Sequence, residues 1–179
     1  MISVASVDFS VLNYIQQSMR SSFLDRTMVL ASGLGNNGII WIVFILFLFA
    51  VRRYRRYGIA VGASLMLSMV ICAVLKIAVH RIRPCDINTA VQLLIARPTD
   101  FSFPSGHTTA SFAVTTALFY YRNRLWIPAG IVSVFIGFSR LYLYVHFPSD
   151  VLGGILLGIT GAVSACTFCR RKIFFCRQC

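Results

Sequence analysis

Two cationic residues, Lys76 and Arg83, stand seven residues apart in a largely apolar stretch that ends at Pro84. Seven residues make about two turns of an α-helix, so we expect both side chains on one helix face. Pro84 discourages the helix from continuing. Two stacked cations repel each other, and an anion between them relieves that repulsion. The spacing therefore predicts an anion-binding site.

A second candidate site is the segment 103–107, which reads Phe-Pro-Ser-Gly-His and stands directly before an apolar stretch. Ser105 suits the N-cap of a helix, and the backbone N–H groups that follow an N-cap are free to bind an anion. Gly106 permits close approach of another group, and His107 stands beside it. The alternative is an ordinary helix start with a lone histidine.

The third segment carries Arg140, His146 and Asp150, with Pro148 breaking the helix between the last two. A spacing of six puts Arg140 and His146 about 240° apart on an ideal helix, so they converge only if the helix ends first. Asp150 can accept a hydrogen bond from one nitrogen of His146. The other nitrogen is then a free nucleophile.

Together the three segments suit phosphoryl transfer, which depends mainly on positioning and charge neutralisation. Three cations can neutralise a phosphate dianion, His146 can attack phosphorus, and His107 can protonate the departing oxygen. Lys76 and Arg140 lie inside apolar stretches, where a charge is costly and usually marks function; the alternative is snorkelling to the interface. The chain has no Glu and only five Asp, so it can hardly supply the carboxylates of a two-metal site.

The composition of the 179 residues requires a membrane around these segments. Hydrophobic residues make up 58% of the chain and charged residues 12%, which excludes a soluble, disordered or disulfide-stapled protein. The net charge of +12 fits basic loops beside membrane spans better than nucleic-acid binding. The sequence predicts an all-α, polytopic membrane helical bundle.

The apolar pattern predicts a single domain with an N-terminal interfacial helix and five spans. Residues 1–30 form the interfacial helix, amphipathic from Asp8 to Met28, and no removable signal peptide precedes it. The expected spans are 30–51, 58–79, 105–121, 125–144 and 150–168, followed by a Cys- and Arg-rich tail at 170–179. The first span is the shortest apolar run, so it must take in Asn36 and Asn37.

Charge also predicts the topology. Clusters at 52–56, 122–124 and 170–177 hold 10 of the 17 basic residues and fall on one side of a five-span path. The positive-inside bias makes that side cytoplasmic. The three segments then lie at the extracytoplasmic ends of the spans of a multi-pass cell-membrane protein.

The pattern Lys-x6-Arg-Pro, Pro-Ser-Gly-His, Ser-Arg-x5-His-x3-Asp over 76–150 resembles the full signature of the type 2 phosphatidic acid phosphatase (PAP2) superfamily. The resemblance implies a phosphohistidine at His146, with His107 as general acid and Asp150 as partner of His146. It implies phosphate binding by Lys76, Arg83, Ser105, Gly106 and Arg140, without cofactor or metal. The short length is similar to bacterial phosphatases of undecaprenyl diphosphate or phosphatidylglycerophosphate.

Several alternatives stay open. The same residues would serve a phosphatidate phosphatase, a lipid phosphotransferase, or an anionic-lipid transporter or binding module, although a binding module has no need of a nucleophile. We expect lipid phosphate and membrane lipids, not nucleic acid, as partners, and the oligomeric state stays undetermined.

For several other charged residues, for His80 and for the cysteines, the sequence gives weaker evidence of a functional role. The sequence favours solvated side chains for Arg81, Asp86, Arg97 and Asp100, and no role for His80. For Cys166, Cys169, Cys176 and Cys179 it favours reduced or palmitoylated thiols over zinc.

Overall fold

A computed structural model describes residues 4–175 of the chain, and within them all regular structure is helical. The helices are α1 (Val4–Ser18), α2 (Ser22–Gly35), α3 (Ile39–Ala50), α4 (Arg55–Val79), α5 (Pro84–Ile87), α6 (Gly106–Tyr120), α7 (Trp126–Tyr142) and α8 (Pro148–Phe175), with a 3₁₀ turn at Asn36–Gly38. The all-α fold predicted from the sequence is confirmed.

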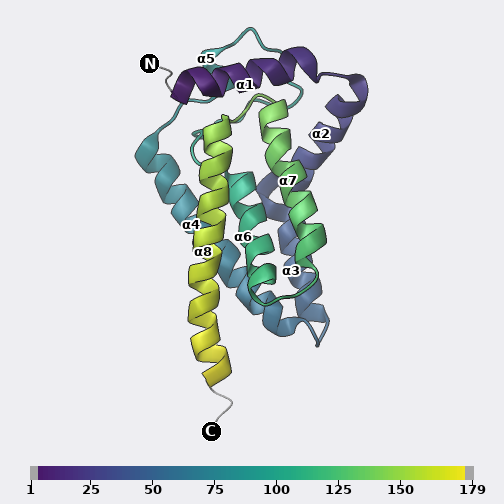
Figure 1. The fold of residues 1–179 in the computed structure, drawn as a ribbon, viewed down its shortest axis with the longest axis vertical. Helices are drawn as coiled ribbons and strands as arrows, with labels where there is room; N and C mark the ends of the chain where they lie inside the picture. Colours follow the sequence, from purple (N-terminus) through teal and green to yellow (C-terminus); the bar gives the residue numbers. More distant parts are fainter. Residues whose placement is uncertain (1–3, 176–179) are drawn as a thin grey trace.

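Helix α6 stands at the centre of the bundle and packs against α4, α7 and α8 (Figure 1). Two glycines of α8 permit this close packing. A Cβ atom on Gly158 would lie 2.7 Å from the carbonyl oxygen of Thr109, and one on Gly154 would lie 2.8 Å from that of Ser105. Small residues that let two helix backbones approach are typical of membrane bundles.

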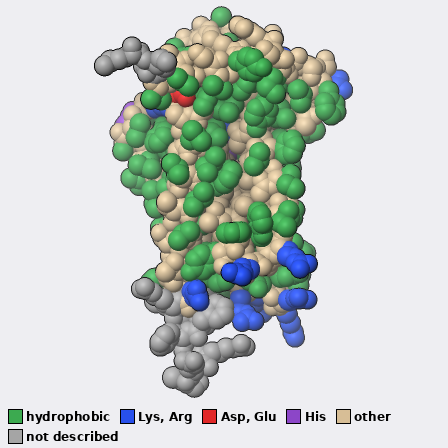
Figure 2. Space-filling model, in the orientation of Figure 1, with side chains coloured by type: hydrophobic (Ala, Val, Ile, Leu, Met, Phe, Trp, Pro, Cys, Tyr) green, Lys and Arg blue, Asp and Glu red, His purple; other side chains and the backbone are tan. Residues whose placement is uncertain are grey.

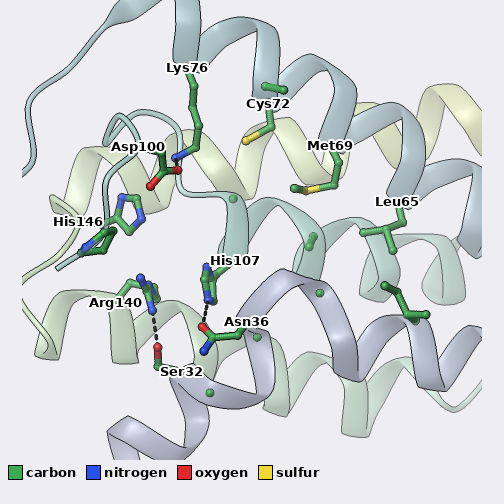
Figure 3. Close-up of a pocket in the computed structure, with 18 of the residues that line it drawn as sticks. Ser32, Asn36, Leu65, Met69, Cys72, Lys76, Asp100, His107, Arg140 and His146 are labelled. Carbon is green, nitrogen blue, oxygen red and sulfur yellow. Dashed lines mark hydrogen bonds and ion pairs between the residues drawn. The ribbon is translucent and has the colours of Figure 1, made fainter. Parts of the chain in front are cut away.

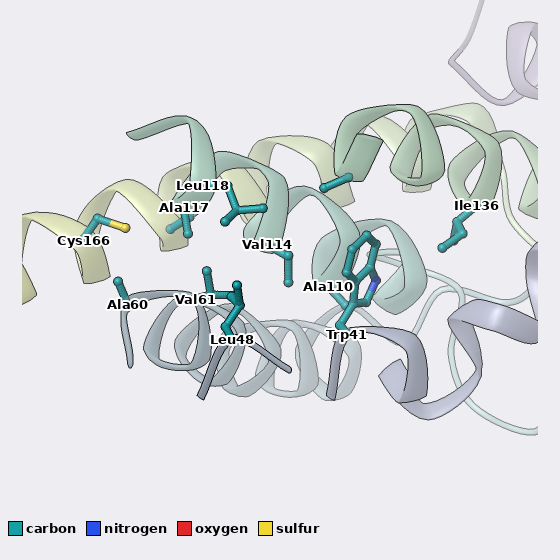
Figure 4. Close-up of a cluster of buried hydrophobic side chains, with 12 residues drawn as sticks. Trp41, Leu48, Ala60, Val61, Ala110, Val114, Ala117, Leu118, Ile136 and Cys166 are labelled. Carbon is teal, nitrogen blue, oxygen red and sulfur yellow. The ribbon is translucent and has the colours of Figure 1, made fainter. Parts of the chain in front are cut away.

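The half of the bundle away from α1 has an apolar core (Figure 4). Its fully buried members come from five helices: Trp41, Leu48, Ala60, Val61, Ala110, Val114, Ala117, Leu118, Ala129, Ile136, Ala162 and Cys166. The one indole N–H in this core donates a hydrogen bond to Ser111 Oγ over 3.0 Å, so the ring is buried without an unpaired donor. This core holds α3, α4, α6, α7 and α8 together.

The N-terminal region forms two helices where the sequence predicts one. Helix α1 lies across one end of the bundle, and α2 descends from it along the side (Figure 1). The break comes at Ser21, whose side chain caps α2 by accepting a hydrogen bond from Leu24 N–H at 3.3 Å. The continuous amphipathic helix from Asp8 to Met28 is therefore wrong, because a serine N-cap restarts the helix.

The predicted first span, 30–51, is also interrupted. Helices α2 and α3 meet at an angle of 55°, and the 3₁₀ turn Asn36–Gly38 joins them. Gly38 has φ +67°, a conformation that glycine adopts without strain. The polar Asn-Asn-Gly sequence ends one helix and starts another, so residues 30–51 belong to a bent pair of helices, and their crossing as one span stays a prediction.

Within residues 4–175, two helical stretches are long and apolar enough to cross a membrane, Arg55–Ile87 and Pro148–Arg170, and the bent pair α2–α3 makes a third if it forms one span. The helices α6 and α7 begin and end close to the predicted spans 105–121 and 125–144, but have 15 and 17 residues, fewer than the roughly 20 of a full span. The structure therefore supports a helical membrane protein and leaves the count of five spans as a prediction.

Basic side chains concentrate at the end of the bundle opposite α1 (Figure 2). The α3–α4 and α6–α7 links lie side by side there, since the rings of Tyr57 and Tyr121 are 6.0 Å apart. The C-terminal half of α8 joins them, because Tyr121 Oη donates to the carbonyl of Cys166 at 3.2 Å. Helix α8 continues to Phe175, past the predicted end of the fifth span at 168.

Candidate active site

A cavity of about 1080 Å³ opens between α2, α3, α4, α6 and α7. Five of the predicted site residues with charged or imidazole side chains line it: Lys76, Arg83, His107, Arg140 and His146. Gly106 and Asp100 line it as well (Figure 3). The structure thus brings the three sequence segments to one place, with the cations and both imidazoles around one end of the cavity.

Beyond this end, most of the residues that line the cavity are apolar. Its walls come from helices α2, α3 and α4 and include Val29, Ile42, Ile45, Leu46, Leu65, Met66 and Met69. A compact cationic end that continues into a long apolar trough suits a ligand with an anionic head and a hydrocarbon chain.

His146 lies beyond the end of α7, as the prediction of convergence requires. The helix stops at Tyr142, and Tyr144 takes a left-handed conformation with φ 60°. The chain then folds back, so that the N–H groups of Val145 and His146 both approach the carbonyl oxygen of Arg140, at 3.2 and 3.4 Å. This turn removes the 240° offset expected on a continuous helix.

The surroundings of His146 select one tautomer. Arg83 Nη1 lies 3.1 Å from Nε2, and a guanidinium only donates hydrogen bonds, so Nε2 carries the lone pair and Nδ1 the proton. Burial, together with the positive charges of Arg83, Arg140 and Lys76, lowers the pKa of His146 well below its ordinary value. The imidazole is therefore neutral near pH 7, with its electron pair on Nε2, where Arg83 donates a hydrogen bond to it.

Asp150 contacts His146 less directly than the sequence predicts. The distance from His146 Nδ1 to Asp150 Oδ2 is 3.6 Å, longer than a hydrogen bond. Ser102 lies between the two side chains: its hydroxyl is 3.5 Å from Nδ1 and donates a short hydrogen bond to Asp150 Oδ2. The same oxygen accepts from Phe147 N–H at 2.8 Å. Asp150 thus orients His146 partly through Ser102, a residue that the sequence analysis missed.

His107 stands in the first turn of α6, with Nε2 3.1 Å from Asn36 Oδ1. Gly35 packs on its ring so closely that a Cβ atom there would lie 2.6 Å from His107 Cδ2. Both contacts come from the break between α2 and α3. The Asn-Asn-Gly turn that interrupts the predicted span therefore positions an imidazole of the site.

Ser105 occupies the N-cap position of α6, but its side chain makes no capping hydrogen bond. The hydroxyl is fully buried and accepts from Thr108 Oγ1 at 2.9 Å, and Ser105 is not among the residues that line the cavity. Gly106, in contrast, lines it. The helix N-terminus faces the site through Gly106 and His107, with Ser105 behind them.

Lys76 and Arg83 converge by a route that differs from the prediction. Helix α4 ends at Val79, and His80 has φ 49°, so the two cations do not share a helix face. Arg83 is instead the residue before α5, with Pro84 in the first turn. Both cations hold one carboxylate: Lys76 Nζ and Arg83 Nη2 each lie 2.6 Å from an oxygen of Asp100.

Arg140 has a partly satisfied guanidinium. Its side chain is 3% exposed, and Nη1 donates a short hydrogen bond to Ser32 Oγ in α2. Its Nε has no hydrogen-bond partner among the described residues. A buried donor without a partner is uncommon, and this one belongs to a side chain that lines the cavity.

Two residues expected to be solvated form ion pairs with partners that are buried or largely buried. Asp100 binds Lys76 and Arg83, and Arg81 donates to Asp150 Oδ1 at 2.5 Å and to Asp8 Oδ2 at 2.7 Å. Their partners stand far away in the sequence, so no local pattern marked them. By contrast, Arg97 and Asp86 form a largely exposed pair at 3.2 Å.

His80 is exposed and packs its ring edge-on against Phe101. Among residues 4–175, no three His, Cys, Asp or Glu side chains lie close enough to hold a metal ion. Cys166 and Cys169 carry free thiols. Cys176 and Cys179, the other two members of the possible zinc set, lie outside the described residues.

Comparisons with known proteins agree with this geometry. The family model described as PAP2 superfamily matches residues 57–174. An undecaprenyl-diphosphatase of Sulfolobus acidocaldarius is 34% identical over 151 residues, 84% of this chain and 71% of the relative. Undecaprenyl-diphosphatase BcrC of Bacillus subtilis is 30% identical over 142 residues, 79% and 73% of the two chains.

A solved structure, the transmembrane PAP2 type phosphatidylglycerolphosphate phosphatase from Bacillus subtilis, superposes with a TM-score of 0.77. Its sequence is 27% identical, and the match covers 96% of this chain and 89% of that one. The family model spans α4 to α8, which carry every predicted site residue, and the solved fold extends the likeness to nearly the whole chain. The chain therefore belongs to the PAP2 superfamily, as its three motifs predict.

Proposed function

We propose that this protein is a metal-independent phosphatase that hydrolyses undecaprenyl diphosphate at the extracytoplasmic face of the cell membrane. Membership of the PAP2 superfamily and relatives named as diphosphatases and phosphatases support a hydrolase of lipid phosphate bonds. The two relatives reported above that are named undecaprenyl-diphosphatases favour this substrate.

The observation that carries the proposal is the shape and charge of the cavity. Lys76, Arg83 and Arg140 surround one end together with both imidazoles, and most of the other lining residues are apolar. Positioned cations stabilise the charge that spreads over the equatorial oxygens during phosphoryl transfer. An apolar trough beside them accommodates the chain of a lipid substrate.

In the first step, Nε2 of His146 attacks the terminal phosphorus and forms an N–P bond, while the P–O bond to the lipid monophosphate breaks. His107 donates a proton to that leaving oxygen. Asp150, helped by Ser102, holds the Nδ1 proton and stabilises the positive charge that the imidazole gains. The product of this step is a phosphohistidine.

In the second step, His107 removes a proton from water and the water oxygen attacks phosphorus. The N–P bond breaks, its electron pair returns to Nε2, and inorganic phosphate leaves. Arg83 Nη1 contacts Nε2 in the structure, so it must transfer this hydrogen bond to a phosphate oxygen before the first attack. Such a shift exposes the lone pair only when phosphate is bound.

The extracytoplasmic placement rests on the distribution of charge. Five membrane crossings, with α6 and α7 as short spans, bring the α3–α4 link, the α6–α7 link and the C-terminal segment to one side. The α3–α4 and α6–α7 links carry Arg-rich clusters, which lie at the end opposite α1 (Figure 2). The positive-inside bias makes that end cytoplasmic, and the site lies toward the other end.

Phosphatidylglycerophosphate is the second candidate substrate, since the solved structure with a TM-score of 0.77 is named as a phosphatase of that lipid. The same side chains could also hydrolyse phosphatidate. They could equally transfer the phosphoryl group to another lipid in place of water. An anionic-lipid transporter or binding module would use the same cations and has no need of Asp150 beside His146.

The test is release of phosphate by the purified protein in liposomes from undecaprenyl diphosphate, phosphatidylglycerophosphate and phosphatidate in parallel. We expect undecaprenyl diphosphate to be cleaved with the highest kcat/KM. Loss of a catalytic imidazole typically lowers the rate about 10²–10⁴-fold. We therefore expect kcat/KM to fall by at least about 10²-fold in both His146→Ala and His107→Ala. His80→Asn is the matched control, because His80 is exposed and Asn tolerates its left-handed backbone.

Full activity of folded His146→Ala on all three lipids would show that the proposed chemistry is wrong. A transfer reaction would appear as phosphorylated acceptor in place of inorganic phosphate. A binding module would retain lipid binding in His146→Ala, and the unsubstituted protein would release no phosphate.

A further inference from the structure

The carboxylate of Asp100 lies in the cavity between the two cations that α4 and the start of α5 supply (Figure 3). Oδ2 is 2.6 Å from Lys76 Nζ, and Oδ1 is 2.6 Å from Arg83 Nη2. The Asp100 side chain is 58% exposed, whereas that of Arg83 is 3% exposed and that of Lys76 15%. An anion on the cavity side therefore covers two buried or largely buried cations.

The backbone next to this carboxylate is fixed independently of it. Arg83 Nε donates to the carbonyl of Asp100 at 2.8 Å, and Lys76 Nζ donates to the carbonyl of Phe101 at 2.6 Å. Ser102 N–H bonds the carbonyl of Arg81 at 2.8 Å. The Asp100 side chain can therefore rotate away from the cations while these carbonyls keep both cations in place.

The carboxylate is ionised at neutral pH. Partial burial alone would raise the pKa of Asp100, but the hydrogen bond from Lys76 and the charges of Arg83 and Lys76 outweigh it and hold that pKa well below its ordinary value. A phosphate group would need the same two donors, because charge-assisted bonds to Lys and Arg are the strongest that it can make.

We infer that Asp100 is a built-in competitor of phosphate, which occupies Lys76 and Arg83 with its own carboxylate and so weakens the binding of inorganic phosphate. The inference rests on the proposed function, because it assigns Asp100 to release of the product from that same site. As phosphate departs, the Asp100 carboxylate returns to its hydrogen bonds with Lys76 and Arg83. An incoming lipid substrate must displace the carboxylate again.

Displacement of the carboxylate costs substrate and product the same free energy. Both can also bind Arg140, which lines the cavity. A lipid substrate offsets the cost by burial of its chain against the apolar lining. Inorganic phosphate has no such chain, so nothing offsets the cost for the product.

The test is the affinity of the protein for inorganic phosphate, measured as the rise of the unfolding temperature with added phosphate and as inhibition of lipid-product formation. In Asp100→Asn the carboxylate charge is gone, and we expect phosphate to bind roughly tenfold more tightly. Asp100→Ala should also bind inorganic phosphate more tightly than the unsubstituted protein. Asp100→Glu keeps the charge and should remain close to the unsubstituted protein.

Asp25→Asn is the control, since Asp25 is a carboxylate that pairs with Arg20 at 3.5 Å and neither residue lines the cavity. Phosphate affinity in Asp100→Asn and Asp100→Ala that is unchanged or weaker would overturn the inference and make Asp100 a support for the cations. The thermal measurement needs no turnover. Failure of the proposed function would instead appear as no phosphate released from any lipid by the unsubstituted protein.

Discussion

Arg81 Nη1 donates a hydrogen bond to Asp150 Oδ1 over 2.5 Å, and Asp150 is completely buried. The other terminal nitrogen of Arg81 holds Asp8 of α1 at 2.7 Å, and the guanidinium lies 4.2 Å from the centre of the Phe147 ring. Asp8 in turn accepts from the backbone N–H of Ser149 at 3.0 Å. An ionic chain thus joins the N-terminal helix to the carboxylate that orients His146.

The first prediction concerns this chain. Arg81→Met leaves the buried carboxylates of Asp8 and Asp150 without their shared cation, so Asp150 should shift away from His146. We expect kcat to fall about 10–100-fold with little change in KM, because Arg81 does not line the cavity and a misplaced catalytic group chiefly lowers the rate.

Steady-state kinetics on the lipid substrate measure separately how Arg81→Met changes kcat and KM. Arg81→Lys should recover part of the lost kcat, and Arg20→Met, at an ion pair with Asp25 outside the cavity, should have no effect. A rise in KM without loss of kcat would contradict a positioning role for Arg81.

The second prediction tests the helix break that holds His107. Gly35→Ala would place a Cβ atom 2.6 Å from His107 Cδ2, so the imidazole must move away from Asn36. Since displacement of a catalytic group by about 1 Å can cost about 10²-fold, we expect a loss of that order in kcat. Gly130→Ala in α7, where the nearest atom would lie 3.5 Å from the new Cβ and which does not line the cavity, should retain full activity. Equal activity of the two variants would exclude this role for Gly35.

The third prediction concerns the contact between α6 and α8. In Gly158→Ala the new Cβ would lie 2.7 Å from the Thr109 carbonyl oxygen and 2.9 Å from Ala113 N, so the two helices must separate. Overpacking of this kind costs about 1–3 kcal/mol. Thermal unfolding in detergent should show a lower midpoint. Gly62→Ala in α4, with nothing within 4 Å, should keep or raise it, and a lower midpoint in both variants would argue against helix separation.

The motif spacing predicted which residues meet, and it did so because each motif lies where a helix starts or ends, near the same end of the bundle. The predicted spans 105–121 and 125–144 agree closely with α6 and α7, since Pro104, Ser105 and the arginines at 122 and 124 mark their ends. The break at Asn36–Gly38 escaped prediction because it lies between two apolar stretches that together have the length of one span.

Pairwise contacts over long sequence distances were the least predictable part of the site. Arg81 and Asp8 are 73 residues apart, and Ser102 and Asp150 are 48 apart, so only the fold reveals that they interact. The local rule that charged residues of an outer loop are solvated holds for Asp86 and Arg97. It fails for Arg81, which holds two buried carboxylates, whereas Asp100 is 58% exposed and still pairs with two cations.

The fourth prediction concerns metal ions. Lys76, Arg83 and Arg140 surround the cationic end of the cavity and can neutralise the phosphate oxygens themselves. Phosphate release should therefore persist after dialysis against a chelator, and added Mg²⁺ or Zn²⁺ should not raise it. Loss of activity on chelation, restored by one of these ions, would contradict the assignment of charge neutralisation to the three side chains.

The central claim is that His146 becomes covalently phosphorylated during turnover. The most direct measurement is acid-labile, base-stable phosphate on the protein, detected after rapid quenching with a lipid diphosphate labelled at its terminal phosphorus. Label should appear on the peptide that contains His146, and no label should appear in His146→Ala. Phosphate release without any labelled intermediate, or label on His107 instead, would contradict the account.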